Sequence, residues 1–413
     1  MNITKSLVHL MLLALSNAFT NKTLVLVNLV YRHGARSPIE FFPNNQYINQ
    51  WPVDPGMLTK VGMNMEFELG KFLKKRYIES SFINQSYIAK EVYIRSSDES
   101  RCLQSAETQL AGLYPPIGYQ VWNENITWQP IPVHTVPGDV DPVLRSDDTY
   151  CPRLKKLLKQ LTLKPEYIQK EHENQDFLRV LSNYSGMTVN FTNLWIIDDA
   201  IKCEKAQGFK GPKWYKEVEK PLHELAAWIF LQEYNEVDDE LGRLLGGNLL
   251  NLININMLKY FDSKSYDGIY KLTMYSGHDT SIMSLTAALN VDITPPTFAS
   301  CFMIELYQHS NGDLYVEMQF RNDTSGNTVP FKLKNCGFSC PLLEFLRLTS
   351  RRTANKQHCY NESKNDEIFT FLQLKIGAAV FMSLTIVLIF SLFIFIIRRK
   401  RALIIGHKRL LEI

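Results

Sequence analysis

Residues 23–38, TLVLVNLVYRHGARSP, pass from a continuous apolar run directly into a cluster of charged residues. The first nine, rich in β-branched side chains, are typical of a strand buried on both faces in the middle of an α/β sheet. Arg32, His33 and Arg36 follow at the carboxyl end of this strand, where open α/β sheets bind their ligands. The stretch therefore predicts an α/β fold and indicates which edge of the sheet holds its functional site.

Two further segments show the same arrangement of a short apolar strand followed by titratable residues. Residues 91–95 form a predicted strand that ends in Arg95. Residues 271–275 form another, which is followed by His278 and Asp279. Because the carboxyl ends of parallel strands meet at one edge of a sheet, we expect these side chains to lie near those of the first strand.

The remaining elements fit a central, mostly parallel sheet flanked by helices. Residues 58–77 and 102–113 place apolar side chains at helical spacing. Residues 302–307 and 314–320 flank the sequence Asn-Gly-Asp, which is a hairpin signal. Between about 147 and 261 the periodicity stays helical, so we predict a smaller helical subdomain inserted between sheet strands.

Both ends of the chain have the composition of targeting and anchoring segments. Residues 1–18 combine a lysine, an apolar run and a small final residue, as cleavable signal peptides do. Residues 376–397 contain no charged residue and are long enough to cross a bilayer. The basic residues that follow predict a cytosolic tail over 398–413, which places residues 19–374 in the lumen or outside the cell. We therefore predict a single-pass type I membrane protein.

The cysteines agree with an oxidising compartment. Six of the seven could form three disulfides, with Cys102 left over, and composition alone does not choose the pairs. These six are Cys151, Cys203, Cys301, Cys336, Cys340 and Cys359. Because the chain has no C-x-x-C pair and no histidine cluster beside its cysteines, we predict neither a metal site nor a cofactor.

Glycosylation sequons and charge point to the same compartment and exclude one class of partner. N-x-S/T sequons lie at Asn84, Asn125, Asn183, Asn190, Asn322 and Asn361. The formal net charge is +3, but six Lys and Arg residues follow residue 397, so the body of the chain is slightly acidic. A slightly acidic body offers no electrostatic footprint for nucleic acid.

The charged residues at the three strand ends together supply what phosphoryl transfer requires without a metal. Arginine matches phosphate oxygens, neutral imidazole can act as the nucleophile, and a carboxylic acid can protonate the leaving alkoxide. Taken singly, Arg95 fits a strand-end ion pair, His278 a structural hydrogen bond and Asp279 a helix N-cap. The heptapeptide 32–38 is different, because two arginines and a histidine in one place repel one another unless an anion lies between them.

These motifs resemble a known family. RHGARSP at 32–38 matches the RHGxRxP signature of the histidine acid phosphatases, and SGHD at 276–279 resembles their second motif. The segments YIRSSDESRCLQSAE at 93–107 and WQPIPVHTVPGD at 128–139 resemble the animal branch with the prostatic and lysosomal enzymes. The resemblance spans about residues 24–359 and implies a phosphoglycerate mutase-like fold in the histidine phosphatase superfamily, branch 2.

The resemblance also implies a role for each site residue. His33 would attack phosphorus and form a phosphohistidine, which water then hydrolyses, and Asp279 would protonate the leaving group. The phosphate oxygens would be held by Arg32, Arg36, Arg95 and His278. The implied disulfides are Cys151–Cys359, Cys203–Cys301 and Cys336–Cys340. Related proteins also form homodimers. An acid pH optimum is expected, because a carboxyl with an ordinary pKa of about 3.9 stays protonated in an acidic medium.

Two functions besides a broad acid phosphatase stay open at this point. A phytase or inositol-polyphosphate phosphatase would need additional cations at the pocket mouth. The helical segment does contain lysines, among them Lys202, Lys205, Lys210 and Lys213, although scattered lysines more often form a solvated face. A catalytically silent ectodomain that binds a phosphorylated ligand is the other function, and such a protein would be expected to have lost its nucleophile or its proton donor. Delivery to the lysosome and residence at the cell surface are both compatible with the tail.

Overall fold

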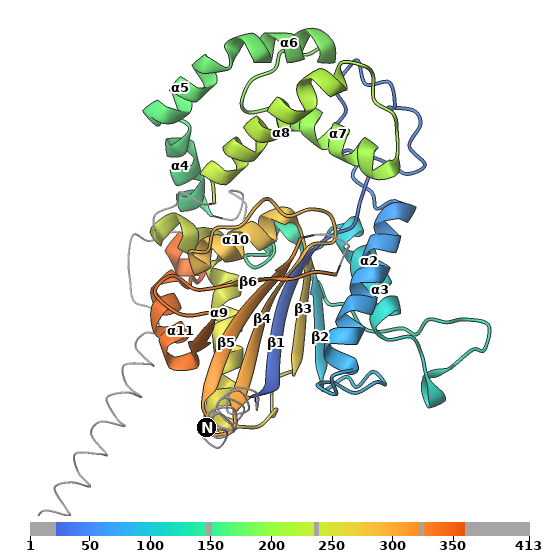
Figure 1. Ribbon diagram of the computed structural model, residues 1–413, viewed down its shortest axis with the longest axis vertical. Coiled ribbons are helices and arrows are strands. Elements are labelled where there is room, and N and C mark those ends of the chain that lie inside the picture. Colours follow the sequence, from blue (N-terminus) through green and yellow to red (C-terminus); the bar gives the residue numbers. More distant parts are fainter. Residues whose placement is uncertain (1–21, 146–150, 235–238, 323–325, 360–413) are drawn as a thin grey trace, which may run out of the picture. The chain divides into compact units, whose positions relative to one another are not determined.

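In the computed structural model, the described residues are 22–145, 151–234, 239–322 and 326–359 (Figure 1). The predicted signal peptide, the apolar span, the tail and the sequon at Asn361 lie outside these ranges. Within the ranges, no helix combines the length and hydropathy needed to span a membrane.

A seven-stranded sheet forms the centre of the fold, in the order β2-β3-β1-β4-β5-β6, with β7 paired to β5. The strands are β1 Lys22–Arg32, β2 Val92–Ser96, β3 Leu272–Gly277, β4 Cys301–His309, β5 Leu314–Arg321, β6 Val329–Phe331 and β7 Ser339–Pro341. β2, β3 and β1 are parallel, whereas β4 runs antiparallel to β1 and forms the predicted hairpin with β5. The predicted α/β class with a central sheet flanked by helices is confirmed.

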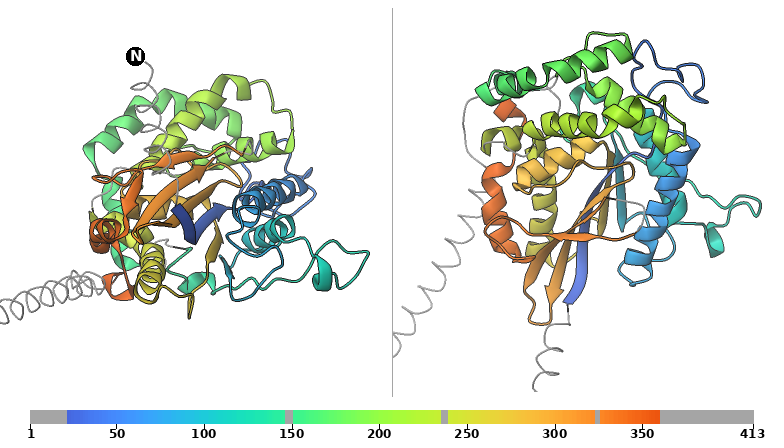
Figure 2. Two further views of the ribbon diagram at one scale, coloured as in Figure 1. Left: turned by 60° about the horizontal axis from the view of Figure 1, so that its bottom comes forward. Right: turned by 45° about the horizontal axis from the view of Figure 1, so that its top comes forward.

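Helices cover both faces of the sheet, which explains the continuous burial of β1. On one face, α2 (Lys60–Leu73) and α3 (Ser100–Leu113) lie side by side (Figure 2). They pack on alternate residues of β1 such as Leu29. On the other face, α9 (Asp239–Ser263) packs on α10 (Asp279–Leu289) and reaches β1 through a hydrogen bond from Asn256 to Asn28. The shorter elements are a π-helix at Lys74–Ile78, α11 at Leu342–Thr349, and 3-10 turns at Gly118–Gln120, Gly138–Val140, Ser350–Arg352 and Lys356–Cys359.

Five helices lie over the edge of the sheet at which β1, β2 and β3 end (Figure 1). They are α4 Pro152–Leu161, α5 Pro165–Glu173, α6 Gln175–Ser185, α7 Trp195–Gln207 and α8 Tyr215–Gln232. Their buried residues form a separate core that Phe42, from the loop after β1, enters. The predicted helical segment thus contains this layer and also α9, which packs against the sheet side of the molecule.

The chain turn after β1 depends on a close approach between two glycines. The hydroxyl of Thr59 caps α2 by accepting from the Gly62 amide and donates to the carbonyl of Ala35. A Cβ added to Gly62 would lie 2.0 Å from the Ala35 oxygen, and one added to Gly34 would lie 2.3 Å from the Gly62 oxygen. Only glycine at both positions therefore lets α2 hold the charged loop.

Gly62→Ala is expected to destabilise the protein, because the added methyl overlaps backbone atoms that cannot move without shifting the charged loop. We expect the free energy of unfolding to fall by about 1–3 kcal/mol in urea titrations. Met63→Ala, one residue further on the solvent side of α2, should change it by less than about 0.5 kcal/mol. Equal stabilities of the two variants would contradict this packing argument.

Two of the three implied disulfides are present. Cys151 is bonded to Cys359, and Cys336 to Cys340. The implied Cys203–Cys301 bond is wrong for this structure, in which both residues are buried free cysteines. Cys102 is a buried free cysteine, as expected.

The two cysteines of the missing disulfide belong to different layers. Cys203 lies on α7, and its sulfur contacts Arg36 and Asp199 at the sheet edge. Cys301 opens β4 and packs in the core between the sheet and the α2–α3 pair. The spacing of the cysteines along the chain gave no information about this separation.

Sequons differ in how accessible their asparagines are. Four of these are exposed, namely Asn84, Asn125, Asn183 and Asn190. Asn322 is partly buried, and its side-chain amide donates to Thr294 and Pro295 while its oxygen accepts from the Thr297 amide. Glycosylation at each of them stays a prediction.

Candidate active site

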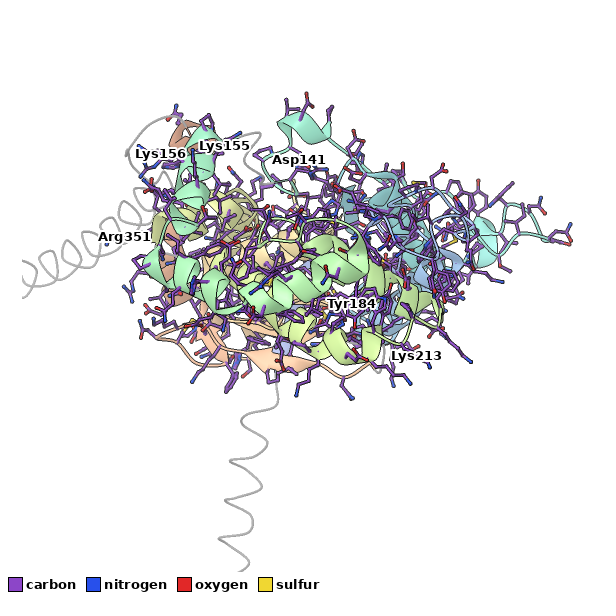
Figure 3. All side chains as sticks on the ribbon, turned by 90° about the horizontal axis from the view of Figure 1, so that it is seen from above. Asp141, Lys155, Lys156, Tyr184, Lys213 and Arg351 are labelled. Carbon is purple, nitrogen blue, oxygen red and sulfur yellow. A yellow bond between two sulfur atoms is a disulfide. The ribbon has the colours of Figure 1, made fainter. Side chains whose placement is uncertain are left out.

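The carboxyl ends of β1 and β3 align in register, so that Arg32 lies opposite Gly277. The residues that follow, His33 and His278, are both buried, with rings 5.6 Å apart and nearly perpendicular. Figure 3 looks onto this edge, which helices α5–α8 cross. The end of β2 meets the same edge, because Ser97 contacts the ring of His278, so the three strand ends come together as the sequence predicted.

Backbone and side-chain contacts fix the orientation of His33. Its amide donates to the carbonyl of Gly277 and its carbonyl accepts from the amide of Ala299, which ties it to the ends of two neighbouring strands. Nδ1 lies 2.9 Å from the carbonyl oxygen of Gly34, which can only accept, so Nδ1 bears the proton. The lone pair is consequently on Nε2, the nitrogen that is free to attack an electrophile.

His33 is neutral even in an acidic medium. Burial, and then the positive charges of Arg32 and Arg36, lower the pKa of His33 well below its usual value. His278 and Arg101 act in the same direction. An uncharged imidazole surrounded by cations has the properties of a nucleophile for an anionic substrate.

Arg32 is held rigidly beside this imidazole. One of its terminal nitrogens donates to the carbonyl of Pro296 at 2.7 Å, and its guanidinium lies 4.4 Å from the centre of the Phe298 ring. The other terminal nitrogen forms a 2.9 Å ion pair with Asp279. Its Nε is buried without a partner among the described residues, which leaves a donor for an anion.

Asp279 is the first residue of α10, and the N-cap position is occupied by His278. Burial favours the neutral acid, but the charges of Arg32 and Arg36 outweigh it and lower the pKa of Asp279 below its ordinary value. The carboxyl is thus ionised when the site holds no anion. An anion that takes over Arg32 would remove this stabilisation and raise the pKa of the carboxyl.

Arg36 is paired with a residue that the sequence did not single out. Both terminal nitrogens of Arg36 donate to Asp199 of α7, at 2.8 Å each, and both side chains are almost fully buried. The Asp199 carboxylate also accepts from the amide of Ile39. A helix of the covering layer therefore supplies the counter-ion of Arg36.

His278 is held between Ser97 and Arg101. Arg101 donates to Nδ1 at 3.5 Å, and Nε2 lies 3.0 Å from the hydroxyl of Ser97, so Nε2 bears the proton. Burial, and then the charge of Arg101, lower the pKa of His278 to about 3. His278 is therefore uncharged, and its single N–H donates to Ser97. The Cys102 sulfur lies 3.6 Å from its ring, and burial raises the pKa of that thiol, which makes it a poor nucleophile.

The structure places Arg95 away from this pair of histidines. Its guanidinium donates at 2.5 Å to Asp141, whose side chain is fully buried. Asp141 accepts from the amide of Leu144, and the Leu144 carbonyl accepts from the hydroxyl of Ser281, which in turn caps the His278 amide. Arg95 thus supports the loop beside His278 instead of facing the predicted phosphate position.

Arg101, and not Arg95, lies beside His278, where the sequence predicted Arg95 to be. It lies on the first turn of α3, and Glu99 pairs with both Arg101 and Arg145 beside His278. The sequence feature that could have identified Arg101 is its position at the start of the helix that follows a strand, because such helix starts lie at the functional edge of the sheet. Because side chains alternate between the two faces of a strand, the strand pattern alone does not direct Arg95 toward His278.

Arg101→Ala is expected to lower catalytic efficiency, whereas Arg95→Ala is expected to lower stability. Loss of Arg101 removes a cation that contacts His278 at the site and should lower kcat/KM by about 10²-fold with little change in stability. Loss of Arg95 leaves Asp141 buried and unpaired, and should cost about 3 kcal/mol of unfolding free energy. Steady-state kinetics and urea titration of both variants would distinguish these effects. A larger kinetic defect in Arg95→Ala at equal stability would reverse the assignment.

A cavity of about 280 Å³ opens from the arginines toward the covering helices. Its lining includes Arg32, Arg36 and Asp279 on the sheet side and Trp195 and Phe230 on α7 and α8. Two larger cavities, about 660 and 730 Å³, lie at the opposite end of β3, around Lys271, and share no lining residue with the first cavity. Among the described residues, no group of three or more His, Cys, Asp or Glu side chains is placed to bind a metal ion.

The fold, with a neutral histidine among arginines at the ends of its parallel strands, indicates the class of protein. The comparison with protein families identifies the same class. Residues 23–321 match the model of the histidine phosphatase superfamily (branch 2), and the chain belongs to this family.

Particular relatives are similar over most of the chain. The lysosomal acid phosphatase of Rattus norvegicus is 38% identical over 90% of this chain and 88% of its own. The prostatic acid phosphatase of Homo sapiens is 41% identical over 79% of this chain and 85% of its own. The phytase of Citrobacter braakii shares the fold, with a TM-score of 0.62 at 20% identity over 82% of this chain and 99% of its own.

Proposed function

We propose that this protein is an acid phosphatase, which hydrolyses phosphate monoesters through a phosphohistidine intermediate on His33. The observation that carries the proposal is the convergence of Arg32, Arg36 and Arg101 on a neutral imidazole whose Nε2 is free. The curated relatives named above are acid phosphatases, which supports the same activity.

In the first step, the phosphate of the substrate binds among the three arginines. Arg32 and Arg36 each have a buried Nε–H without a partner among the described residues, and these donors are suited to phosphate oxygens. His278 contributes an uncharged hydrogen-bonding group. The negative charge of the phosphate then competes with Asp279 for Arg32, so the pKa of Asp279 rises and the carboxyl takes up a proton.

The chemistry then needs two in-line displacements at phosphorus. Nε2 of His33 forms a bond to phosphorus as the bond to the alcohol oxygen breaks, and Asp279 gives its proton to that oxygen. In the second step the Asp279 carboxylate takes a proton from water, whose oxygen attacks phosphorus as the bond to Nε2 breaks. The hydrogen bond from Nδ1 of His33 to the Gly34 carbonyl keeps the ring oriented throughout.

Hydrolysis of 4-nitrophenyl phosphate by the purified lumenal body tests the proposal. We expect turnover with an acid optimum, because protonated Asp279 and neutral His33 coexist only in that range. A protein that is folded but inactive between pH 4 and 8 would instead favour the silent ectodomain that binds a phosphorylated ligand.

Location and assembly are further parts of the proposal. The names of the relatives support a lumenal or extracellular body, and the apolar residues 376–397 followed by a basic tail support a single-pass anchor. Sodium carbonate extraction of membranes should leave the full chain in the pellet and release a chain ending at Cys359. A homodimer, as the family resemblance implies, would be detected by light scattering of the same soluble chain.

A further inference from the structure

The cavity beside the arginines is electrically balanced. Its charged lining comprises the cations Arg32, Arg36 and Lys202 and the carboxylates Asp198, Asp199 and Asp279. Each cation has one carboxylate partner, at 2.9 Å for Arg32, 2.8 Å for Arg36 and 2.5 Å for Lys202. The number of cations therefore equals the number of carboxylates, in contrast to the excess of cations that a polyphosphate requires.

The rest of the cavity wall is apolar. It is formed by Ile39, Trp195, Ala226, Ala227, Phe230 and two prolines of the loop before β4. Trp195 is 40% exposed, so much of its ring is available to a ligand. An aromatic or aliphatic alcohol group would bury apolar surface here, whereas a second charged group would lose its hydration without gaining a partner.

Asp199 occupies the decisive position in this arrangement. Its carboxylate lies against Arg36 and is held there by the Ile39 amide, so its negative charge is fixed next to the phosphate position. Asp198 also lines the cavity but differs from Asp199, because its carboxylate pairs with Lys202 and His223. A second phosphate that entered the cavity would approach the Asp199 charge directly.

We propose that Asp199 determines specificity by restricting the site to substrates with one phosphate group and an uncharged, apolar alcohol part. This inference rests on the proposed phosphatase function and adds the substrate class. It separates the protein from the phytases that share its fold. Arg36, neutralised by Asp199, binds a single phosphate through its remaining donor and does not attract a second one.

The test compares two substrates that differ by one phosphate, propyl phosphate and propane-1,3-diyl bisphosphate. We expect the wild-type protein to favour the monophosphate in kcat/KM. Asp199→Asn should raise the relative kcat/KM for the bisphosphate on the order of tenfold, because one unit charge close to the second phosphate is removed. Asp176→Asn, on the exposed surface of α6, makes the same change in net charge outside the cavity and should leave the ratio unaltered.

A second variant provides an independent test in case Asp199→Asn does not fold. Ile39→Lys adds a cation to the cavity lining at a partly exposed position and leaves Asp199 in place, so it too should raise the bisphosphate ratio. The inference is overturned if the wild type uses both substrates equally, or if neither folded variant changes the ratio. A wild-type protein that hydrolyses neither these nor 4-nitrophenyl phosphate would refute the proposed function itself.

Discussion

His33→Ala is expected to lower kcat for 4-nitrophenyl phosphate on the order of 10⁴-fold, because the variant lacks the atom that forms the covalent intermediate. The side chain is buried and, in the part of the chain that the structure describes, its polar partner is the carbonyl of Gly34, so the loss should not unfold the protein. His172→Ala, at an exposed position of α5, is the matched control and should keep wild-type activity. Circular dichroism would establish that both variants are folded.

Trapping the intermediate makes this expectation specific to His33. Rapid alkaline quenching of the wild type during turnover, followed by peptide mass spectrometry, should find a phosphoryl group on the peptide that contains residues 32–38. The His33→Ala variant should have none. Phosphorylation of any other residue, or undiminished hydrolysis by the variant, would contradict the proposed chemistry.

Asp279→Asn is expected to have an effect that depends on the leaving group. An alkyl phosphate releases a strongly basic alkoxide and needs the proton from Asp279, so kcat should fall by about 10²–10⁴-fold. A 4-nitrophenolate leaves without protonation, so the loss with the aryl substrate should be much smaller. Measurement of kcat for propyl phosphate and 4-nitrophenyl phosphate gives the ratio directly. An equal loss with both substrates would assign Asp279 to binding instead of proton transfer.

The pH dependence provides an independent check on the same residue. In the free site the charges around Asp279 lower its pKa, but bound phosphate raises it again, so kcat of the wild type should fall as the pH rises through that value. Asp279→Asn should lack this alkaline limb. The acid limb should remain in both proteins, because it reflects protonation of His33, whose pKa burial and then Arg32 and Arg36 lower. A persistent alkaline limb in the variant would indicate another proton donor.

The stretch from Thr23 to Pro38 was sufficient to predict the class of fold and to place His33 at the sheet edge where the site lies. A strand with no polar face must be covered on both sides. The residues that directly follow it necessarily lie at its carboxyl end, where such sheets bind their ligands. For the same reason His278 and Asp279 were located correctly relative to His33: a strand fixes the direction in which its next residues emerge.

The partners of these residues were decided only by tertiary structure. Arg95 and Arg101 are separated by six positions, and which of them faces His278 depends on the pleat of β2 and the start of α3. Asp199 reaches Arg36 from a helix 163 positions away, and no local pattern marks it. Cys203 and Cys301 were paired by resemblance but lie in different layers. Local sequence determines where a strand ends because backbone geometry is local, whereas the contacts between distant side chains depend on how whole layers pack.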